Sequence, residues 1–393
     1  MTEVAKQIDS ALAVLVDKSD ASTIQQSLIA TKLIDNKFII TEVDSMIAIP
    51  ILDDEKVKKL TWFDNTKHEI TELSLLVQNR KYTPAEAMAQ DMALYLKQHI
   101  DSDLSALIEN LPQKWELFGD LAIIPNSTVN NSQWQDFFGR ITQEQEQEIW
   151  QIITQALRVK RLARQDKIAT DMMRTSQVKM LLGDSGEVEI NDFGVKFWLD
   201  VTKVMFSSGN VTERHRIGDI DMSGEIIVDA FAGIGYYSLP MLVRSNAEHV
   251  YACEINPNSI QALQNGAKLN NVSNRLTILE GDNLSTMKQV YSKADRVHLG
   301  ILPSSEKAWQ SAINCLKSNG GMLHIHMNVE EEKIDDFVSY CIDSIAKLAK
   351  QLGREGIVSV DHVEKVKWYA PRMRHIVICL LYTSDAADDT PCV

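Results

Sequence analysis

The C-terminal half of the chain repeats one pattern of apolar and polar residues. From about residue 216 onward, short apolar runs alternate with longer stretches of helical spacing. This alternation predicts an α/β domain in which helices cover a parallel sheet. The predicted strands are EIIVDAF, HVYACEI, LTILEG, RVHLGIL and GMLHIHM. Two later runs, IVSVDHVEKVKWY and HIVICLL, predict a closing hairpin.

The N-terminal half is less regular. Residues 1–105 mix helical patterns with short apolar runs and predict a small α/β domain, which the helix AEAMAQDMALYLKQHI closes. A connecting domain follows at residues 106–215, with strands from WELFGDLAIIPNS onward and a single basic helix over EQEQEIWQIITQALRVKRLAR. Residues 216–381 form the third predicted domain, the α/β domain with the parallel sheet. The small, acidic segment 382–393 is expected to be disordered.

The charge of the chain limits its partners. A formal net charge of -14 argues against nonspecific coating of nucleic acid, which depends on Lys and Arg releasing counterions from phosphates. One stretch departs from this acidic background, and we interpret it as a candidate RNA-facing stripe or, alternatively, a solvated helix face. Its cations are Arg158, Lys160, Arg161, Arg164, Lys167, Arg174 and Lys179.

The location is predicted to be cytosolic. The first twenty residues are amphipathic and acidic, without the basic leader and apolar core of a signal peptide, and no run is long enough to span a bilayer. The five cysteines are scattered, with no CxxC pair, so neither a zinc site nor a disulfide framework is indicated. They are expected to be reduced thiols.

A glycine-rich turn follows the first strand of the predicted sheet. In IIVDAFAGIGYYSLP the strand ends at Asp229, which is predicted to contact a ligand. Gly233 and Gly235 let backbone NH groups approach that ligand without obstruction by Cβ atoms. A dinucleotide fingerprint requires a third glycine where Ser238 stands, which disfavours a nicotinamide-dependent oxidoreductase. A purely structural turn remains an alternative for this motif alone.

Polar residues at the next two strand ends narrow the choice of ligand. Glu254 ends the second strand, where a carboxylate can accept hydrogen bonds from ribose hydroxyls, although it could instead begin the next helix. Asp282 and Asn283 follow the third strand and could meet the edge of an adenine. With no phosphate-binding lysine nearby, these groups predict a ligand that carries adenosine without phosphate. S-adenosylmethionine is the commonest such ligand, and residues 216–381, which carry this candidate site, are therefore the predicted catalytic domain.

Several motifs in register carry a family resemblance. They are WELFGDLAIIP, KRLARQDKI, FWLDVTKVMFSSGNVTERHRI, DAFAGIGYYSLP, YACEINPNSI, GDN, LGILPSSEKAW and GGMLHIHMNV. In this order they resemble the tRNA wybutosine-synthesizing protein 2 family, which is related to archaeal and eukaryotic tRNA guanine-N1 methyltransferases. The resemblance covers residues 111–381 and implies a fold like the class I methyltransferases, a Rossmann-like seven-stranded sheet preceded by a connecting domain and an N-terminal RNA-docking domain.

The resemblance also implies the reaction. This family transfers the 3-amino-3-carboxypropyl group of S-adenosylmethionine to 4-demethylwyosine, the wybutosine precursor base beside the anticodon of tRNA(Phe), and releases methylthioadenosine. A sulfonium has electrophilic carbons on all three arms, so positioning alone can decide which group is transferred. No membrane partner and no metal are expected.

Four positions around FSSGNVTER carry implied roles. Ser207 and Arg214 are expected to hold the carboxylate of the amino-acid arm, as the matching serine and basic residue do in the family. Glu213 is expected to act as general base, with the alternative that it positions Arg214 through an ion pair. The related methyltransferases have an arginine where this chain has Gly209, and this departure favours aminocarboxypropyl transfer.

The substrate contacts are the least defined by the sequence. Pro303, Ser304 and Ser305 follow the fourth strand and are predicted to line the base pocket, with a plain turn as the alternative. Arg161 and Arg164 of the basic stripe are candidate RNA contacts.

Two histidines of the fifth strand, His324 and His326, face one side. They are interpreted as packed core residues, because further metal ligands cannot be placed from the sequence.

Three functions are therefore compared. The first is aminocarboxypropyl transfer to tRNA. The second is guanine-N1 methylation of tRNA from the same cofactor, which would release S-adenosylhomocysteine. The third is a noncatalytic RNA-binding scaffold, which need not retain the Glu254 and Asp282 contacts.

Overall fold

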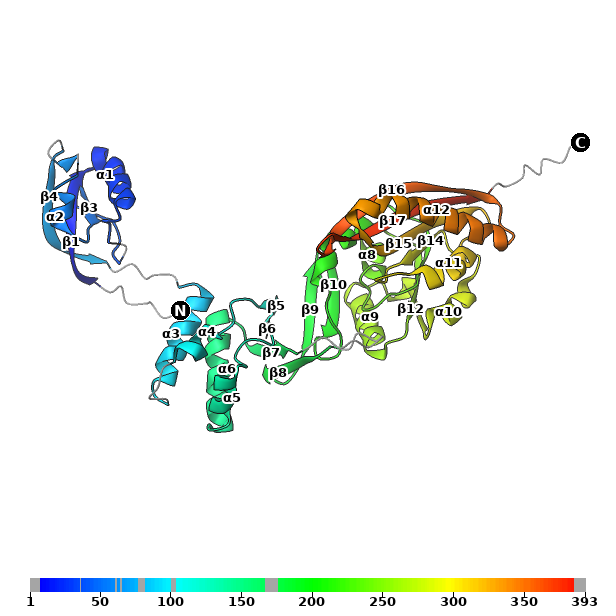
Figure 1. Cartoon of the computed structure of the whole chain (residues 1–393), viewed down its shortest axis with the longest axis horizontal. Helices are drawn as coiled ribbons and strands as arrows, with labels where there is room; N and C mark the ends of the chain where they lie inside the picture. Colours follow the sequence, from blue (N-terminus) through cyan, green and yellow to red (C-terminus); the bar gives the residue numbers. More distant parts are fainter. Residues whose placement is uncertain are drawn as a thin grey trace, which may run out of the picture. The chain divides into compact units, whose positions relative to one another are not determined.

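The structure is a computed structural model that describes residues 8–35, 37–60, 62–63, 66–76, 82–99, 104–166 and 176–384. The chain divides into two compact units, Met1–Glu86 and Ala87–Val393 (Figure 1). Lys167 and Arg174 of the predicted basic stripe lie outside the described residues, as does Cys392. Among the residues that are described, no helix is both long and apolar enough to cross a membrane.

A four-stranded antiparallel sheet in the order β2-β3-β1-β4 forms the first unit. Its strands are β1 (Ile8–Asp17), β2 (Thr41–Val43), β3 (Met46–Pro50) and β4 (His68–Leu76), and its helices are α1 (Lys18–Ala30) and α2 (Asp54–Val57). Val14 and Val16 of β1 pack with Ile24 and Leu28 of α1. Alternate residues of the strand point to the same side of the sheet, and there they contact the apolar face of the helix. This gives the unit its own core.

The helix α3 (Pro84–Leu96) packs with the second unit. Its buried Met88, Met92 and Leu96 belong to the same core cluster as Trp134 and Trp150. The division between the two units, after Glu86, therefore falls in the first turn of α3, because the apolar face of this helix is buried against residues that follow it.

A four-stranded sheet in the order β5-β6-β7-β8 begins the second unit. The elements here are β5 (Glu116–Phe118), β6 (Leu121–Ile124), β7 (Arg161–Gln165) and β8 (Val178–Leu182), with helices α4 (Ser105–Glu109), α5 (Ser132–Phe138) and α6 (Gln143–Leu157). The predicted single basic helix is wrong. It ends at Leu157 because Arg158 adopts the left-handed conformation, with φ 57 and ψ 41, and the following basic residues form β7.

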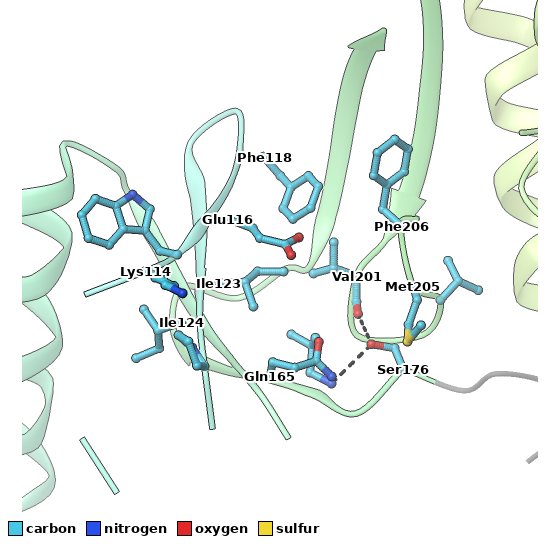
Figure 2. A pocket seen from close by; sticks show the side chains of 14 residues that line it. Lys114, Glu116, Phe118, Ile123, Ile124, Gln165, Ser176, Val201, Met205 and Phe206 are labelled. Carbon is cyan, nitrogen blue, oxygen red and sulfur yellow. Dashed lines mark hydrogen bonds between the residues drawn. The ribbon is translucent and has the colours of Figure 1, made fainter. Parts of the chain in front are cut away.

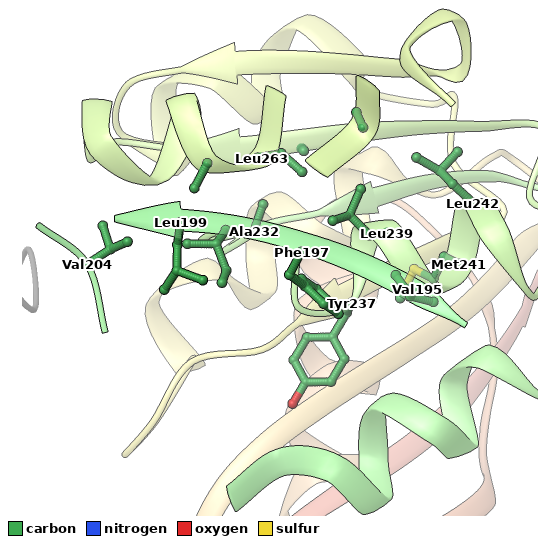
Figure 3. Packing of buried hydrophobic residues seen from close by; sticks show 14 of the residues in the cluster. Val195, Phe197, Leu199, Val204, Ala232, Tyr237, Leu239, Met241, Leu242 and Leu263 are labelled. Carbon is green, nitrogen blue, oxygen red and sulfur yellow. The ribbon is translucent and has the colours of Figure 1, made fainter. Parts of the chain in front are cut away.

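The hairpin β9 (Glu187–Asp192) and β10 (Val195–Asp200) packs onto the catalytic domain. Val195, Phe197 and Leu199 alternate along β10 and lie in one apolar cluster with Leu239 and Leu263, from two helices of that domain (Figure 3). This packing fixes the loop that follows β10, from which the predicted cofactor-arm residues come.

The seven-stranded sheet has the order β13-β12-β11-β14-β15-β17-β16, which confirms the predicted fold class. The five predicted strands run parallel, and the predicted hairpin closes the sheet antiparallel. The strands are β11 (Ile226–Asp229), β12 (His249–Glu254), β13 (Leu276–Glu280), β14 (Arg296–Leu299), β15 (Gly320–Glu330), β16 (Gly356–Ala370) and β17 (Met373–Ser384). The helices are α7 (Val211–Gly218), α8 (Ser238–Val243), α9 (Pro257–Leu269), α10 (Asn283–Thr286), α11 (Trp309–Cys315) and α12 (Ile334–Gln351).

The last strand is longer than predicted. Residues 382–384, assigned from the sequence to a disordered tail, pair with both neighbouring strands, and Tyr382 is buried. The ladder continues because the side chain of Tyr382 packs in the domain core and its hydroxyl donates to the carbonyl of Glu355 at 3.2 Å.

The strand order changes direction beside β11. The chain moves from β11 to β12 and β13 on one side, and β14 and β15 lie on the other. In open parallel sheets a ligand binds at the carboxyl ends of the strands beside such a reversal. The fold therefore brings the three predicted strand ends to one place.

Candidate functional site

A pocket of ≈ 600 Å³ lies at the carboxyl ends of the central strands. The glycine-rich turn, the loop after β10 and the loop after β14 form its walls. Its polar side chains come from Ser207, Asn210, Tyr236, Tyr237, Glu254, Ser259, Asp282 and Asn283. Of the described residues that line it, none is lysine or arginine. The pocket therefore suits a ligand without phosphate groups.

Glu254 joins the second strand end to the glycine-rich turn. Its Oε2 accepts a hydrogen bond from the backbone N of Gly233 at 2.7 Å. Its Oε1 accepts from the backbone N of Ile255 at 2.9 Å and of Asn256 at 2.8 Å. A carboxylate has about four lone-pair positions, so one stays available to a ribose hydroxyl. Gly233 and Gly235 have φ values of 56° and 94°, which explains why glycine stands at both positions.

Asp229 lies beneath the turn and does not line the pocket, although the sequence predicts it as a cofactor contact. It is fully buried, and its carboxylate accepts hydrogen bonds from the hydroxyl of Ser238 at 2.7 Å and the backbone N of Phe231 at 3.3 Å. Burial raises its pKa to about 6. Ser238, which breaks the dinucleotide fingerprint, therefore supports the turn through this buried carboxyl group.

Two side chains that line the pocket each have a buried donor without a partner among the described residues. The donors are the side-chain Nδ2 of Asn283 and the hydroxyl of Tyr237. Asp282 lines the pocket beside them and accepts from the backbone N of Leu284 at 3.0 Å, which caps α10. Since unpaired buried donors are costly, Asn283 and Tyr237 are the side chains best placed to bind a ligand.

The tyrosine pair after the turn is a feature that the sequence interpretation missed. The hydroxyl of Tyr236 donates to the carbonyl of Met205 at 2.6 Å and accepts from the backbone N of Ser207 at 2.8 Å. This holds the loop after β10 against the glycine-rich turn. The adjacent letters YY were a visible signal, but their partners lie about thirty residues away and could not be identified from the sequence.

Ser207 lines the pocket, but Arg214 does not. The guanidinium of Arg214 is buried and donates to Asp192 Oδ2 at 2.7 Å and to the carbonyl of Ser207 at 2.9 Å. Burial alone would raise the pKa of Asp192, but hydrogen bonds from His215 and Arg214 lower it overall. Because its charge is neutralised by Asp192, Arg214 supports the loop instead of presenting a cation to a ligand.

Glu213 is fully buried next to the pocket and is not among its lining residues. Both of its carboxylate oxygens accept hydrogen bonds from Arg216, from Nε and Nη2, each at 2.7 Å. Burial raises the pKa of Glu213, although the Arg216 contacts act in the opposite direction. The alternative that Glu213 pairs with Arg214 is wrong: its partner is Arg216, one turn further along α7.

The residues predicted to contact the substrate lie outside this pocket. Leu302 lines it, whereas Ser305 is buried and its hydroxyl accepts from the indole Nε1 of Trp309 at 3.1 Å. Pro303 and Ser304 are likewise absent from the lining, and the hydroxyl of Ser304 accepts from the backbone N of Glu306 at 3.2 Å.

The two arginines predicted to contact RNA form contacts within residues 106–215, the predicted connecting domain. Arg161 forms an ion pair with Asp120 at 2.6 Å and donates to the carbonyls of Ser185 and Glu187. Arg164 lies 3.5 Å from the carbonyl of Val129. Both therefore stabilise the protein itself in this structure.

A chain of buried histidines lies behind the pocket. His326 contacts His298 through Nε2 and His375 through Nδ1, each at 3.0 Å. His324 is buried as well, as the sequence interpretation expected, and contacts Cys379 Sγ at 3.1 Å. Glu213, His298 and His326 offer ligand atoms within 4.8 Å of one another, a grouping that the sequence did not reveal.

These histidines predict that stability falls in acid. Burial holds the pKa of His298, His324 and His326 well below 6.5 and lowers that of His375 to about 4. In the unfolded chain these histidines bind a proton at about pH 6.5, whereas in the folded protein they stay neutral to lower pH. The free energy of unfolding therefore falls as the pH drops below about 6.5, by about 1.4 kcal/mol per pH unit for each histidine. Asp229, with its raised pKa, acts in the opposite direction between its folded value of about 6 and its unfolded value of 3.8.

Urea denaturation of wild type and the His326→Asn variant between pH 6.5 and 5 tests this expectation. The free energy of unfolding should fall less steeply with pH in the variant, by about 1.4 kcal/mol per pH unit. Equal slopes for the two proteins would contradict it.

A second pocket of ≈ 370 Å³ adjoins the first on the side of the connecting sheet. It shares Val204 and Met205 with the larger pocket. Figure 2 shows Phe118 and Phe206 on one side of it and the polar ends of Glu116 and Gln165 facing the space. An aromatic wall with amide and carboxylate groups suits a flat heterocycle.

Two known domain families match successive parts of the second unit. The TRM5/TYW2 methyltransferase domain matches residues 188–355, and the TYW2 N-terminal domain matches residues 96–186. The structure of TYW2 from P. horikoshii in complex with MeSAdo is similar, with a TM-score of 0.58 and 25% identity, over 75% of this chain and 99% of that one.

Two curated relatives carry matching names. The tRNA wybutosine-synthesizing protein 2/3/4 of Arabidopsis thaliana is 40% identical over 295 residues, which are 75% of this chain but 28% of that protein. The chain thus spans about a quarter of this longer relative. The tRNA wybutosine-synthesizing protein 2 homolog of Danio rerio is 39% identical over an alignment of 302 residues that covers 69% of this chain and 72% of the relative. With both domains matched and most of this relative covered, the chain belongs to the tRNA wybutosine-synthesizing protein 2 family.

Proposed function

We propose that this protein transfers the 3-amino-3-carboxypropyl group of S-adenosylmethionine to 4-demethylwyosine in tRNA(Phe) and releases methylthioadenosine. The observation that carries the proposal is the carboxylate of Glu254 in a pocket whose described lining residues include no lysine or arginine. Such a pocket favours an adenosine without phosphate. The related TYW2 structure holds MeSAdo, the nucleoside that this transfer would release.

The reaction is balanced without a further reactant. The nucleophilic carbon of the base attacks the γ-carbon of the amino-acid arm, and a carbon–carbon bond forms as the bond between that carbon and sulfur breaks. The electron pair stays on sulfur, which becomes the neutral thioether of methylthioadenosine. The base loses the proton of the attacked position. The protein's task is therefore to align the two reactants and to accept one proton.

The residues around the pocket divide this task. Glu254 holds the ribose, and Asp282 and Asn283 meet the adenine, with Asn283 using its unpaired Nδ2. Gly233 and Gly235 let the backbone approach the nucleoside, and Asp229 supports their turn. Ser207, which lines the pocket from the loop after β10, contacts the amino-acid arm.

The substrate base is proposed to enter from the adjoining pocket. This space opens between Trp115, Phe118 and Phe206, and meets the larger pocket at Val204 and Met205. A base that leaves the RNA stack can lie against such aromatic rings. Lys179 of the basic stripe pairs with Asp166 at 3.4 Å, but its side chain is exposed, so it remains a candidate phosphate contact. A cytosolic location remains a prediction from the sequence.

Product analysis tests the function. The purified protein is incubated with S-adenosylmethionine and tRNA(Phe) that carries the precursor base, and small products and digested nucleosides are identified by mass. We expect methylthioadenosine and a nucleoside that has gained one aminocarboxypropyl group. The matched control is the same tRNA with unmodified guanosine at that position, which should give neither product.

The two alternative functions predict other results. S-adenosylhomocysteine together with a methylated guanosine would identify the guanine-N1 methyltransferase, the activity of the related family. Neither product, together with tRNA binding and no affinity for the cofactor, would identify a scaffold. The intact lining of the pocket, with two unpaired buried donors, favours a protein that binds the cofactor.

A further inference from the structure

The proposed cofactor brings a carboxylate into a pocket that offers it no lining cation. S-adenosylmethionine carries one carboxylate on its amino-acid arm, and the described side chains of the pocket include the two acids Glu254 and Asp282. The two cations nearest in sequence to Ser207 already have acidic partners: Lys203 pairs with Asp200 at 3.1 Å, and the buried Arg214 pairs with Asp192 at 2.7 Å. A cation for the carboxylate must therefore come from another element.

Lys367 of β16 lies against this loop at Gly209. It is not among the residues that line the pocket, but Gly209 stands in the chain between two that are, Ser207 and Asn210. The strand packs beside the short helix η2 (Ser208–Asn210), and a Cβ atom built on Gly209 would overlap the ammonium group of Lys367. Its Cδ and Cε atoms would stand 3.2 Å away. Any side chain at position 209 would thus displace the lysine. Ser207, two residues before Gly209, and Asn210, directly after it, line the pocket.

Lys367 carries no ion pair or hydrogen bond from its ammonium group within the part of the chain that the structure describes. Other lysines of this region are paired: Lys365, two residues earlier on the same strand, contacts Glu331 at 2.8 Å. Lys367 is half-buried, and burial together with the nearby Arg214 lowers its pKa. A half-buried ammonium without a carboxylate is stabilised by an anion brought by a ligand.

We infer that Lys367 binds the carboxylate of the amino-acid arm of S-adenosylmethionine, across the loop at Gly209. This inference rests on the proposed function and adds a residue from the closing hairpin to the site. A cation placed there anchors the end of the arm whose γ-carbon is attacked, which helps to fix that carbon toward the base. Gly209 is required because its missing side chain leaves the space that the lysine occupies.

Calorimetric binding of three ligands to the full chain tests the inference. They are S-adenosylmethionine, decarboxylated S-adenosylmethionine, which lacks only the carboxylate, and methylthioadenosine, which lacks the arm. Replacing Lys367 with methionine should weaken the binding of S-adenosylmethionine about tenfold to hundredfold, which is the loss of affinity expected for one charge-assisted hydrogen bond. The affinities of the other two ligands should stay within about twofold, below the effect of any lost charged bond. Lys367→Arg should retain most of the affinity.

Lys365→Ala is the matched control, since this lysine lies on the same strand and pairs with a surface acid; it should leave all three affinities unchanged. Equal weakening of all three ligands by Lys367→Met, or no weakening of any, would overturn the inference while leaving the proposed function standing. A loss of tRNA affinity with unchanged cofactor affinity would also overturn it and assign the lysine to a phosphate. Failure of the wild-type protein to bind any of the three ligands would remove the proposed function as well.

Discussion

Replacing Glu254 with alanine is expected to weaken the binding of S-adenosylmethionine by about tenfold to 150-fold, because one charge-assisted hydrogen bond to the ribose, worth about 1.5–3 kcal/mol, is lost. The carboxylate also accepts three backbone hydrogen bonds, one of them from Gly233 in the turn. Its removal thus leaves the turn less fixed as well as the ribose unbound. Calorimetry with S-adenosylmethionine and methylthioadenosine measures both losses.

The sharpest control for this variant is Glu280→Ala. Glu280 is the residue of β13 that pairs with Glu254 in the parallel ladder, and it is exposed and absent from the pocket lining. Its loss changes the net charge equally but should leave both affinities unchanged. If Glu254→Ala bound both ligands as well as wild type, the ribose contact and the nucleoside site built on it would be excluded.

The sequence predicted the parts of the site that depend on local order. A strand that ends in Asp229, Glu254 or just before Asp282 places each acid at the carboxyl edge of a parallel sheet, and adjacency of the strands then brings the ends together. The glycines at 233 and 235 are required by positive φ values, which are also a local property. The strands and the position of the pocket followed from these features.

Contacts between distant segments could not be predicted in this way. The family resemblance predicts that Arg214 contacts the cofactor, yet its partner is Asp192, at the end of β9, which sequence spacing does not connect to it. Lys367 reaches the same loop from a strand of the closing hairpin. Only the packing of the hairpin and the sheet determines which cation is neutralised and which stays unpaired.

The predicted basic helix is wrong for a different reason. Helical spacing continues in the sequence through Arg164, but Leu162 and Ala163 are both buried in the connecting sheet. A strand that is buried on both faces has apolar residues at successive positions. In the sequence such a short apolar run cannot be distinguished from a segment of a buried helix. The left-handed conformation of Arg158, unusual for a residue other than glycine or asparagine, gave no signal in the sequence.

The second large effect is expected at Glu213. Alanine there should lower the free energy of unfolding by about 3 kcal/mol, because the charge of Arg216 would be left without its partner in a largely buried position. For a domain of this size the melting temperature should fall by about 6–12 °C. Thermal unfolding measures the loss. Arg216→Ala and the double variant complete the cycle, and the double variant should cost less than the sum of the two single changes.

The Glu213→Gln variant distinguishes a structural role of Glu213 from a role in proton transfer. Glu213 lies outside the pocket lining and both its oxygens bind Arg216, so we expect Glu213→Gln to lower stability and turnover while the acid limb of the pH–rate profile is kept. Methylthioadenosine affinity should then stay near the wild-type value, which shows that the pocket is intact. A variant with wild-type melting temperature, a turnover reduced at least about 100-fold and no acid limb would instead identify Glu213 as the general base. Unchanged turnover would exclude that role, because a buried carboxylate that accepts the proton of the base cannot be replaced by an amide without cost.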